Sequence, residues 1–256
     1  MKNGKQDYSE KRLDASTFEH NVDNARIFGA RILVVVAHPD DETLGAGATI
    51  RKFVDKGATV DLCVMSSQAK ARAHRPTDGE LNDDFEKATK TLGIGAVFSG
   101  DFPNIKMNVV PHLDLVQFIE KAILESRAEI VVTHCPSDLN DDHAQTSVAC
   151  QAAVRIFQRR DDAPVLRELW FMETPSSTEW SLDSAKNRFN PNLFIEIGKD
   201  ILETKLRALA SYRGVMHPYP HPRSVEAITG LAAYRGAQAG CCYAEAFECV
   251  FRRIEL

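Results

Sequence analysis

The sequence has no apolar run long enough to cross a membrane and no excess of positive charge. Its longest apolar run covers residues 32–37, far short of the roughly 18 residues that a spanning helix needs. With 31 Lys and Arg residues against 36 Asp and Glu residues, the chain offers no electrostatic surface for nucleic acid or an anionic membrane. Residues 1–10 are polar and lack the apolar stretch of a signal peptide. We therefore expect a cytoplasmic protein with no membrane span and no nucleic-acid partner.

Cysteine is present, but not in the pattern of a disulfide framework. The six cysteines are irregularly spaced, and Cys241 and Cys242 are adjacent. Such frameworks belong mainly to short secreted chains, whereas 256 residues are enough to bury a core. Because 44% of the residues are hydrophobic and 26% are charged, the composition excludes a disordered, collagen-like or coiled-coil chain. The sequence predicts a globular protein with reduced thiols.

Three common functional motifs are missing as well. Gly45 and Gly47 form a G-x-G pair, but Ile50 stands at the third glycine position of a dinucleotide fingerprint. Both glycines also lie inside a predicted helix rather than before it. The P-loop and the G-x-S-x-G nucleophile elbow are absent from the sequence. Clusters of ionisable residues are therefore the remaining candidates for chemistry.

Apolar, β-branched runs alternate with amphipathic stretches along most of the chain. Residues 32–37 are typical of a strand buried on both faces, and a predicted helix at 43–56 and a strand at 58–65 follow. This alternation predicts an α/β fold with a mostly parallel sheet and helices on both faces, elaborated in its C-terminal part. Further strands are expected at 96–99, 129–133, 166–172 and 193–197, and further helices at 15–25, 78–92, 112–126, 142–159, 200–212 and 224–234.

Four ionisable side chains crowd into the segment A-H-P-D-D-E at residues 37–42. The segment follows the carboxyl end of a predicted buried strand, the edge at which open α/β sheets bind ligands. Ionisable groups at such a place are costly unless they are paired, hydrated or bound to a cation. Helix capping explains one or two of the acids, but it does not explain His38. We therefore favour a metal or catalytic site over a capping role.

A second polar cluster follows the strand predicted at 129–133. It contains His134, Asp138, Asp142 and His143. The carboxyl ends of parallel strands meet at one edge, so both clusters should lie together. A catalytic zinc site needs a few nitrogen and oxygen ligands, an open position for water and further carboxylates around the ligands. The sequence predicts one divalent ion per chain, either zinc or another metal that accepts His and Asp ligands.

The segment at 37–42 resembles the signature of the PIG-L (LmbE-like) zinc-dependent N-acetylglucosaminyl deacetylase family, a strand followed by A-H-P-D-D-E. Asp142-His143 matches the family's later x-D-H, and segments at 217–224, 231–232 and 243–247 are similar to the tail of a bacterial branch. The resemblance implies a Rossmann-like open sheet. It also implies a single deacetylase domain over residues 31–256, after an N-terminal extension at 1–30.

The resemblance implies a reaction and a set of roles. The reaction is removal of the N-acetyl group from an N-acetylglucosamine-type sugar conjugate, a small molecule. His38, Asp41 and His143 would hold zinc, and Asp40 would be the general base. Asp142, beside a ligand, would orient or tune its neighbour. The resemblance also makes a homo-oligomer an expectation.

One departure from the family pattern concerns the oxyanion. Many members have a histidine two residues before the Asp of x-D-H, and this chain has Asn140 there. An asparagine amide can donate a hydrogen bond, but it can neither carry a charge nor transfer a proton. Its role is therefore either weaker or supplied elsewhere, and His221 in the C-terminal loop is the candidate.

Another departure concerns substrate binding. Where the family often has an arginine, this chain has Leu81, so Arg72, Arg75 and Arg223 are the candidates to replace it. Asn104 lies where the family has a substrate-binding acid, with a plain loop residue as the alternative. For His134 we expect either a structural role or a substrate contact.

Two further hypotheses stay open. A zinc amidase that acts on a non-sugar N-acyl compound is motivated by Leu81. A non-catalytic, sugar-binding relative is motivated by Asn140, although the presence of every candidate ligand and of the candidate base counts against it.

Overall fold

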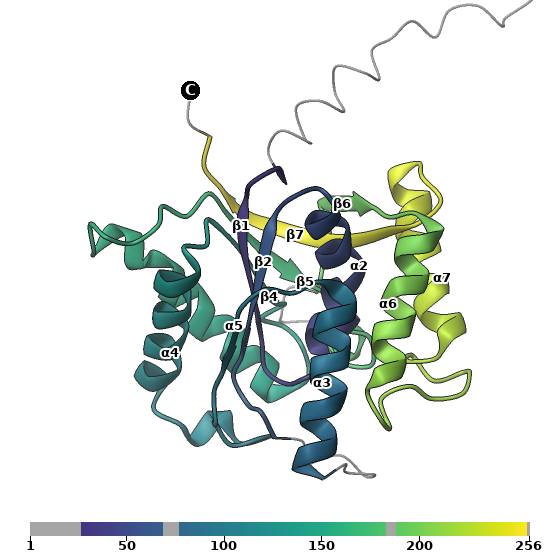
Figure 1. The fold of residues 1–256 in the computed structure, drawn as a ribbon, viewed down its shortest axis with the longest axis horizontal. Helices are drawn as coiled ribbons and strands as arrows, with labels where there is room; N and C mark the ends of the chain where they lie inside the picture. Colours follow the sequence, from purple (N-terminus) through teal and green to yellow (C-terminus); the bar gives the residue numbers. More distant parts are fainter. Residues whose placement is uncertain (1–26, 69–76, 183–187, 255–256) are drawn as a thin grey trace, which may run out of the picture.

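A seven-stranded sheet runs through the centre of the molecule in the computed structural model, which describes residues 27–68, 77–182 and 188–254 (Figure 1). The strand order is β3-β2-β1-β4-β5-β7-β6. The first five strands along the chain are parallel, and β7 runs antiparallel to both of its neighbours. The strands are β1 Arg31–Val36, β2 Thr59–Val64, β3 Val97–Ser99, β4 Ile130–His134, β5 Glu168–Met172, β6 Leu193–Glu196 and β7 Ala244–Arg252. The predicted α/β, mostly parallel architecture is confirmed.

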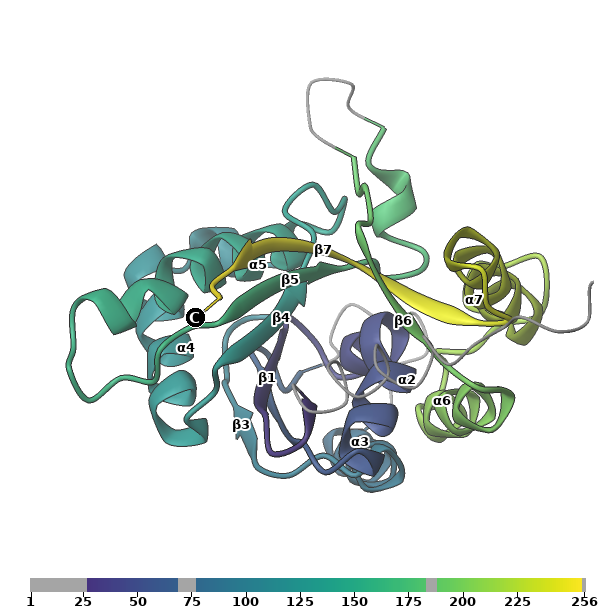
Figure 2. The same ribbon diagram turned by 90° about the horizontal axis from the view of Figure 1, so that it is seen from above.

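Helices cover both faces of this sheet, as Figure 2 shows. Helices α4 and α5 pack together on one face, whereas α2, α3 and α6 contact one another on the other, with α7 beside β6 and β7. The helices are α2 Asp41–Asp55, α3 Asp78–Leu92, α4 His112–Ser126, α5 Asp141–Ala153, α6 Lys199–Ser211 and α7 Val225–Ala239. Within the described ranges, none of them is long and apolar enough to cross a membrane.

Strand β1 separates two apolar cores. Ile32 and Val34 pack into the core under α2 and α6, whereas Leu33 and Val35 pack into the core under α4 and α5. Successive side chains of a strand point to opposite faces, so a strand buried on both sides must be apolar at every position. This explains the unbroken apolar run that marked β1 in the sequence.

Two elements of the structure differ from the prediction. The helix expected at 142–159 ends as α5 at Ala153 and continues as a 3₁₀ helix, Val154–Gln158. Such tightening is common at helix ends. Strand β7 was not predicted, because Glu245 and Glu248 interrupt its apolar residues. The helix expected at 15–25 lies outside the described residues.

Candidate metal centre

Both polar clusters lie at the carboxyl edge of the sheet. One follows β1 and the other follows β4, and these strands are parallel neighbours. The His38, Asp41 and His143 side chains are all buried. The structure thus brings together the three residues that the family resemblance assigned to zinc.

The donor atoms of these residues converge on one point. The Asp41 Oδ2 atom lies 3.4 Å from His38 Nδ1 and 3.2 Å from His143 Nε2. Donor atoms that bind one zinc ion tetrahedrally at about 2.0–2.1 Å lie about 3.3 Å from one another. The spacing therefore fits a divalent cation with two imidazole ligands and one carboxylate ligand.

The charges around this point favour a cation. Burial alone would raise the pKa of Asp41, but His143 and His38 hold it well below its usual value. Burial alone would lower the pKa of His143, but Asp41 and Asp138 raise it to about 10. A positive charge between Asp41 and Asp138 is therefore favoured, and a divalent cation bound to Asp41 and His143 would supply it.

Asp142 orients His38. Its Oδ2 atom lies 2.9 Å from His38 Nε2, which leaves Nδ1 facing Asp41. The fully buried Asp142 carboxylate also accepts hydrogen bonds from the amides of Ile105 and Met107. A carboxylate that holds the far nitrogen of a histidine in this way fixes the tautomer and the ring orientation of a metal ligand.

Asp138 takes the corresponding position beside His143. Its Oδ1 atom lies 3.3 Å from His143 Nδ1, the nitrogen that faces away from Asp41. The hydroxyls of Ser177 and Thr178 donate hydrogen bonds to the same carboxylate. Both histidines of the centre therefore have a buried carboxylate behind them.

His134 lies behind the centre. The amide of Ala37 donates to its Nε2 atom at 3.0 Å, and Thr174 Oγ1 lies 3.3 Å from its Nδ1 atom. Burial lowers the pKa of His134 to about 3, so the ring is neutral. Its ring stacks on that of His143 with centroids 4.0 Å apart. Because protein partners occupy both nitrogens, these contacts favour the structural role over the substrate contact.

Asp40 has an unusual backbone conformation. Its φ of 103° is in the left-handed region, which costs free energy for a residue other than glycine. The Asp40 amide donates to Glu42 Oε2 at 3.0 Å. Glu42 is fully buried, accepts a hydrogen bond from Tyr212 at 2.7 Å, and burial raises its pKa to about 7. Glu42 therefore fixes the turn that carries Asp40 rather than serving as a ligand.

The C-terminal loop reaches the centre through Arg223. Arg223 Nη1 lies 3.3 Å from Asp40 Oδ2, and its Nε atom donates to Ser176 Oγ at 2.6 Å. The Arg223 amide donates to His221 Nδ1 at 3.0 Å. The proton of a neutral His221 ring therefore lies on Nε2. Arg223 is thus placed beside the candidate base.

The other predicted site residues have mixed positions. Asn140 caps α5, because its side-chain oxygen accepts from the amide of Asp142 at 3.0 Å. Asn104 directly precedes Ile105, whose amide binds Asp142, so its loop is fixed next to the centre. Arg72 and Arg75 lie outside the described residues.

Several residues around the centre were not singled out in the sequence. Ile105 and Met107, from the segment before α4, donate their amides to Asp142. Others come from segments after residue 170, where no local motif reveals their contacts, and they hydrogen-bond to residues of the clusters: Thr174, Ser177, Thr178 and Tyr212. Only the tertiary fold identifies them.

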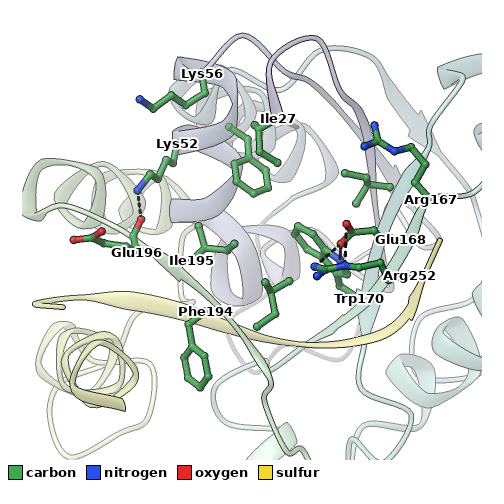
Figure 3. Close-up of a pocket in the computed structure, with 13 residues that line it drawn as sticks. Ile27, Lys52, Lys56, Arg167, Glu168, Trp170, Phe194, Ile195, Glu196 and Arg252 are labelled. Carbon is green, nitrogen blue, oxygen red and sulfur yellow. Dashed lines mark hydrogen bonds and ion pairs between the residues drawn. The ribbon is translucent and has the colours of Figure 1, made fainter. Parts of the chain in front are cut away.

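A separate cavity of about 560 Å³ lies at the opposite edge of the sheet (Figure 3). Ile130 and Glu168, at the amino ends of β4 and β5, line it together with Lys52 near the end of α2. The Glu168 carboxylate is paired with Arg252 at 3.2 Å, and Lys52 donates to a backbone carbonyl. No histidine or cysteine lines this cavity. It is therefore distinct from the candidate metal centre.

Fold and site together define an α/β protein with a His/Asp centre between the carboxyl ends of two parallel strands. The model of the PIG-L family, described as GlcNAc-PI de-N-acetylase, matches residues 33–154. That range contains both polar clusters, so the chain carries a PIG-L family domain, and the resemblance seen in the sequence is confirmed. The division into an extension at 1–30 and one domain at 31–256 stays a prediction.

Two curated proteins and two solved structures are similar to the chain. The uncharacterized deacetylase YaiS of Escherichia coli is 26% identical, over 71% of this chain and 90% of the relative. Diacetylchitobiose deacetylase of Thermococcus kodakarensis is 24% identical, over 84% of this chain and 81% of the relative. The conserved protein TT1542 of Thermus thermophilus has a TM-score of 0.72 at 23% identity, over 89% of this chain and 97% of that one. GalB, the 4-carboxy-2-hydroxymuconate hydratase of Pseudomonas putida, has a TM-score of 0.69 at 22% identity, over 89% of this chain and 98% of that one. The two structures show the shared fold.

Proposed function

We propose that the protein hydrolyses the N-acetyl group of an N-acetylglucosamine-type sugar conjugate, with one zinc ion held by His38, Asp41 and His143. The observation that carries this proposal is the convergence of these three side chains at ligand spacing inside a PIG-L domain. The curated relatives that are named deacetylases support the same reaction class.

Zinc bound at this centre would lower the pKa of a bound water to about 7 and polarise an amide carbonyl. The protein supplies the proton transfers. Asp40 takes a proton from the attacking water and delivers it to the amine as the carbon–nitrogen bond breaks. Acetate and a free amino sugar are the products.

The neighbouring residues hold this arrangement. Arg223 contacts one oxygen of Asp40 and so fixes the carboxylate of the base. Asp142 and Asp138 orient the two histidine ligands. Together these contacts reduce the reorganisation that the reaction requires.

Two residues are proposed to stabilise the developing oxyanion. His221 carries its proton on Nε2, because Nδ1 accepts from the Arg223 amide, and so it has a donor to offer. Asn140 uses its oxygen for the helix cap and keeps its amide nitrogen as a donor. We propose Asn104, Arg72, Arg75 and Arg223 as substrate contacts.

The test is a metal measurement and a hydrolysis assay on the same purified protein. We expect about one divalent ion per chain, and acetate release from N-acetylglucosamine conjugates. The assay panel should include N-acyl compounds without a sugar. Release of acetate from these compounds alone would favour the second candidate function, a zinc amidase that acts on non-sugar N-acyl compounds.

One observation favours that second candidate. Leu81, at the position of the family's usual arginine, is 2% exposed within α3 and offers no contact to a sugar. The hydratase that shares this fold also shows that the fold alone does not set the reaction. The cytoplasmic location and a homo-oligomeric state stay predictions.

A further inference from the structure

A buried ion pair lies against the first turns of α2, just beyond the segment that holds Asp40 and Asp41. Lys205 of α6 and Glu245 of β7 approach to 2.7 Å between Nζ and Oε1. Their side chains are only 7% and 5% exposed. Neither residue belongs to the centre described above.

This pair hydrogen-bonds to the backbone of α2. The Leu44 carbonyl accepts from Lys205 Nζ at 2.8 Å, and the Ala48 amide donates to Glu245 Oε1 at 3.1 Å. The next amide, that of Thr49, donates to the other oxygen of Glu245 at 2.7 Å. In a regular helix the carbonyl of residue 44 faces the amide of residue 48. The two side chains therefore contact one turn of α2 from both of its ends and tie its position to α6 and β7.

The first glycine of the G-x-G pair makes room for the close packing of α2. A Cβ atom on Gly45 would lie 2.5 Å from the sulfur of Met172 at the end of β5. A Cβ atom on Gly47 would make only an ordinary contact with Lys205, at 3.4 Å from its Cγ atom. Gly45 therefore allows α2 to approach β5 closely.

The same helix, α6, contacts the ligand-bearing turn at a second point. Tyr212, directly after α6, donates to Glu42, and Glu42 accepts the amide of Asp40. Lys205 donates to the carbonyl of Leu44, and the amide of Leu44 closes the first turn of α2 by donating to the Asp40 carbonyl. Asp41 directly precedes Glu42, so both contacts lie within three residues of it. The position of its carboxylate therefore depends on how α6 and β7 hold α2.

We propose that Lys205 and Glu245 are positioning residues, whose ion pair sets the orientation of the first turn of α2 and so aligns Asp40 and Asp41 with His143. The inference rests on the proposed function for the identity of the ligands. Stability alone gives no reason for this pair, because apolar residues of similar volume are often as stable as a buried ion pair or more so.

The test is the double substitution Lys205→Met/Glu245→Leu in the full chain. It leaves no unpaired buried charge, and it removes the side-chain contacts to the Leu44 carbonyl and to the Ala48 and Thr49 amides. We expect an unchanged or higher Tm, a Kd for zinc raised about tenfold or more, and an altered visible spectrum of the Co²⁺-loaded protein. A folded variant with the zinc affinity and Co²⁺ spectrum of the wild type would overturn the proposal.

Two further variants keep the test decisive. If the double variant does not fold, Glu245→Gln keeps the side-chain volume. The proposal predicts a weaker zinc affinity for the folded variant, with a lowered Tm because Lys205 keeps its charge without a carboxylate. An unchanged affinity overturns the proposal. The control is Glu168→Gln/Arg252→Met, which removes an ion pair of the same sheet at its other edge. It should leave the zinc affinity unchanged, and a matching loss there would also overturn the proposal.

The outcome is separable from that of the proposed function. A wild-type protein that binds zinc but hydrolyses no acetamide overturns the reaction and leaves the affinity comparison valid. A wild-type protein that binds no divalent ion overturns both.

Discussion

The two edges of the sheet hold different kinds of polar group. At the carboxyl edge, Asp41, Asp138 and Asp142 are buried beside histidines. At the amino edge, the cavity of about 560 Å³ has its charges on a partly exposed rim, where Glu168 is paired with Arg252 (Figure 3). Exposed pairs of this kind cost and contribute little free energy, whereas buried carboxylates require a compensating charge.

This difference shows that a large cavity does not by itself mark a site of chemistry. The cavity at the amino edge has the size of a ligand site. However, the described residues that line it include no histidine and no cluster of converging metal donors. The carboxyl edge has both, because neighbouring parallel strands deliver two clusters to one point. Substitutions at the two edges should therefore have very different effects.

The largest effect is expected for His143→Ala. The substitution removes one of three ligands and leaves Asp41 and Asp138 without the ring between them. We expect the metal content to fall from about one ion per chain to near none, with loss of acetate release. Mass spectrometry of the metal measures this, and His112→Ala, the same change at an exposed histidine, is the control. Full metal content in the His143 variant would contradict the ligand assignment.

The next effect is expected for Asp40→Asn. The amide keeps the size of the side chain but cannot accept the proton, so kcat should fall by roughly 10²–10⁴-fold. Zinc should remain bound, because Asp40 is not among the three converging donors. Parallel measurements of acetate release and metal content test this. Near-normal turnover would show that another group is the base.

A smaller effect is expected for Asp142→Asn. This change removes the charge behind His38 and leaves one oxygen where two now accept from the amides of Ile105 and Met107. The zinc affinity should fall about 10–100-fold, as measured by competition with a chelator. Asp162→Asn, at an exposed carboxylate, is the matched control. Equal affinities of the two variants would mean that Asp142 does not tune the ligand.

The smallest effect is expected for Lys56→Ala at the amino edge. Lys56 lines the cavity there and is exposed to solvent. Its removal should leave acetate release unchanged and alter the free energy of unfolding by less than about 0.5 kcal/mol. Denaturant titration and the hydrolysis assay measure both quantities. A clear loss of activity would contradict the conclusion that only the carboxyl edge of the sheet takes part in the reaction.

Local signals explain which parts of the fold could be predicted. The bounds of α3 follow from Thr77, which forms a capping box with Glu80, and from Gly93, which adopts the left-handed conformation at the other end. The position of both clusters follows from the rule that parallel strands share a carboxyl edge. These inferences need only neighbouring residues and the strand pattern.

Contacts between distant segments explain the rest. Glu245 interrupts the apolar pattern of β7, and it is compensated there by the buried Lys205 and by the amides of Ala48 and Thr49. Glu42 and Tyr212 are separated by 170 positions in the chain. No local sequence pattern predicts that they share a hydrogen bond. The residues that hold the ligand-bearing turn in place can therefore be identified only from the folded structure.

The Asp142 carboxylate joins a metal ligand to the segment that begins with Asn104. It binds His38 on one side and the amides of Ile105 and Met107 on the other. Any molecule that shifts this segment on binding also changes the support of His38. Thermodynamic reciprocity then requires that the metal and that molecule change each other's affinity by the same factor.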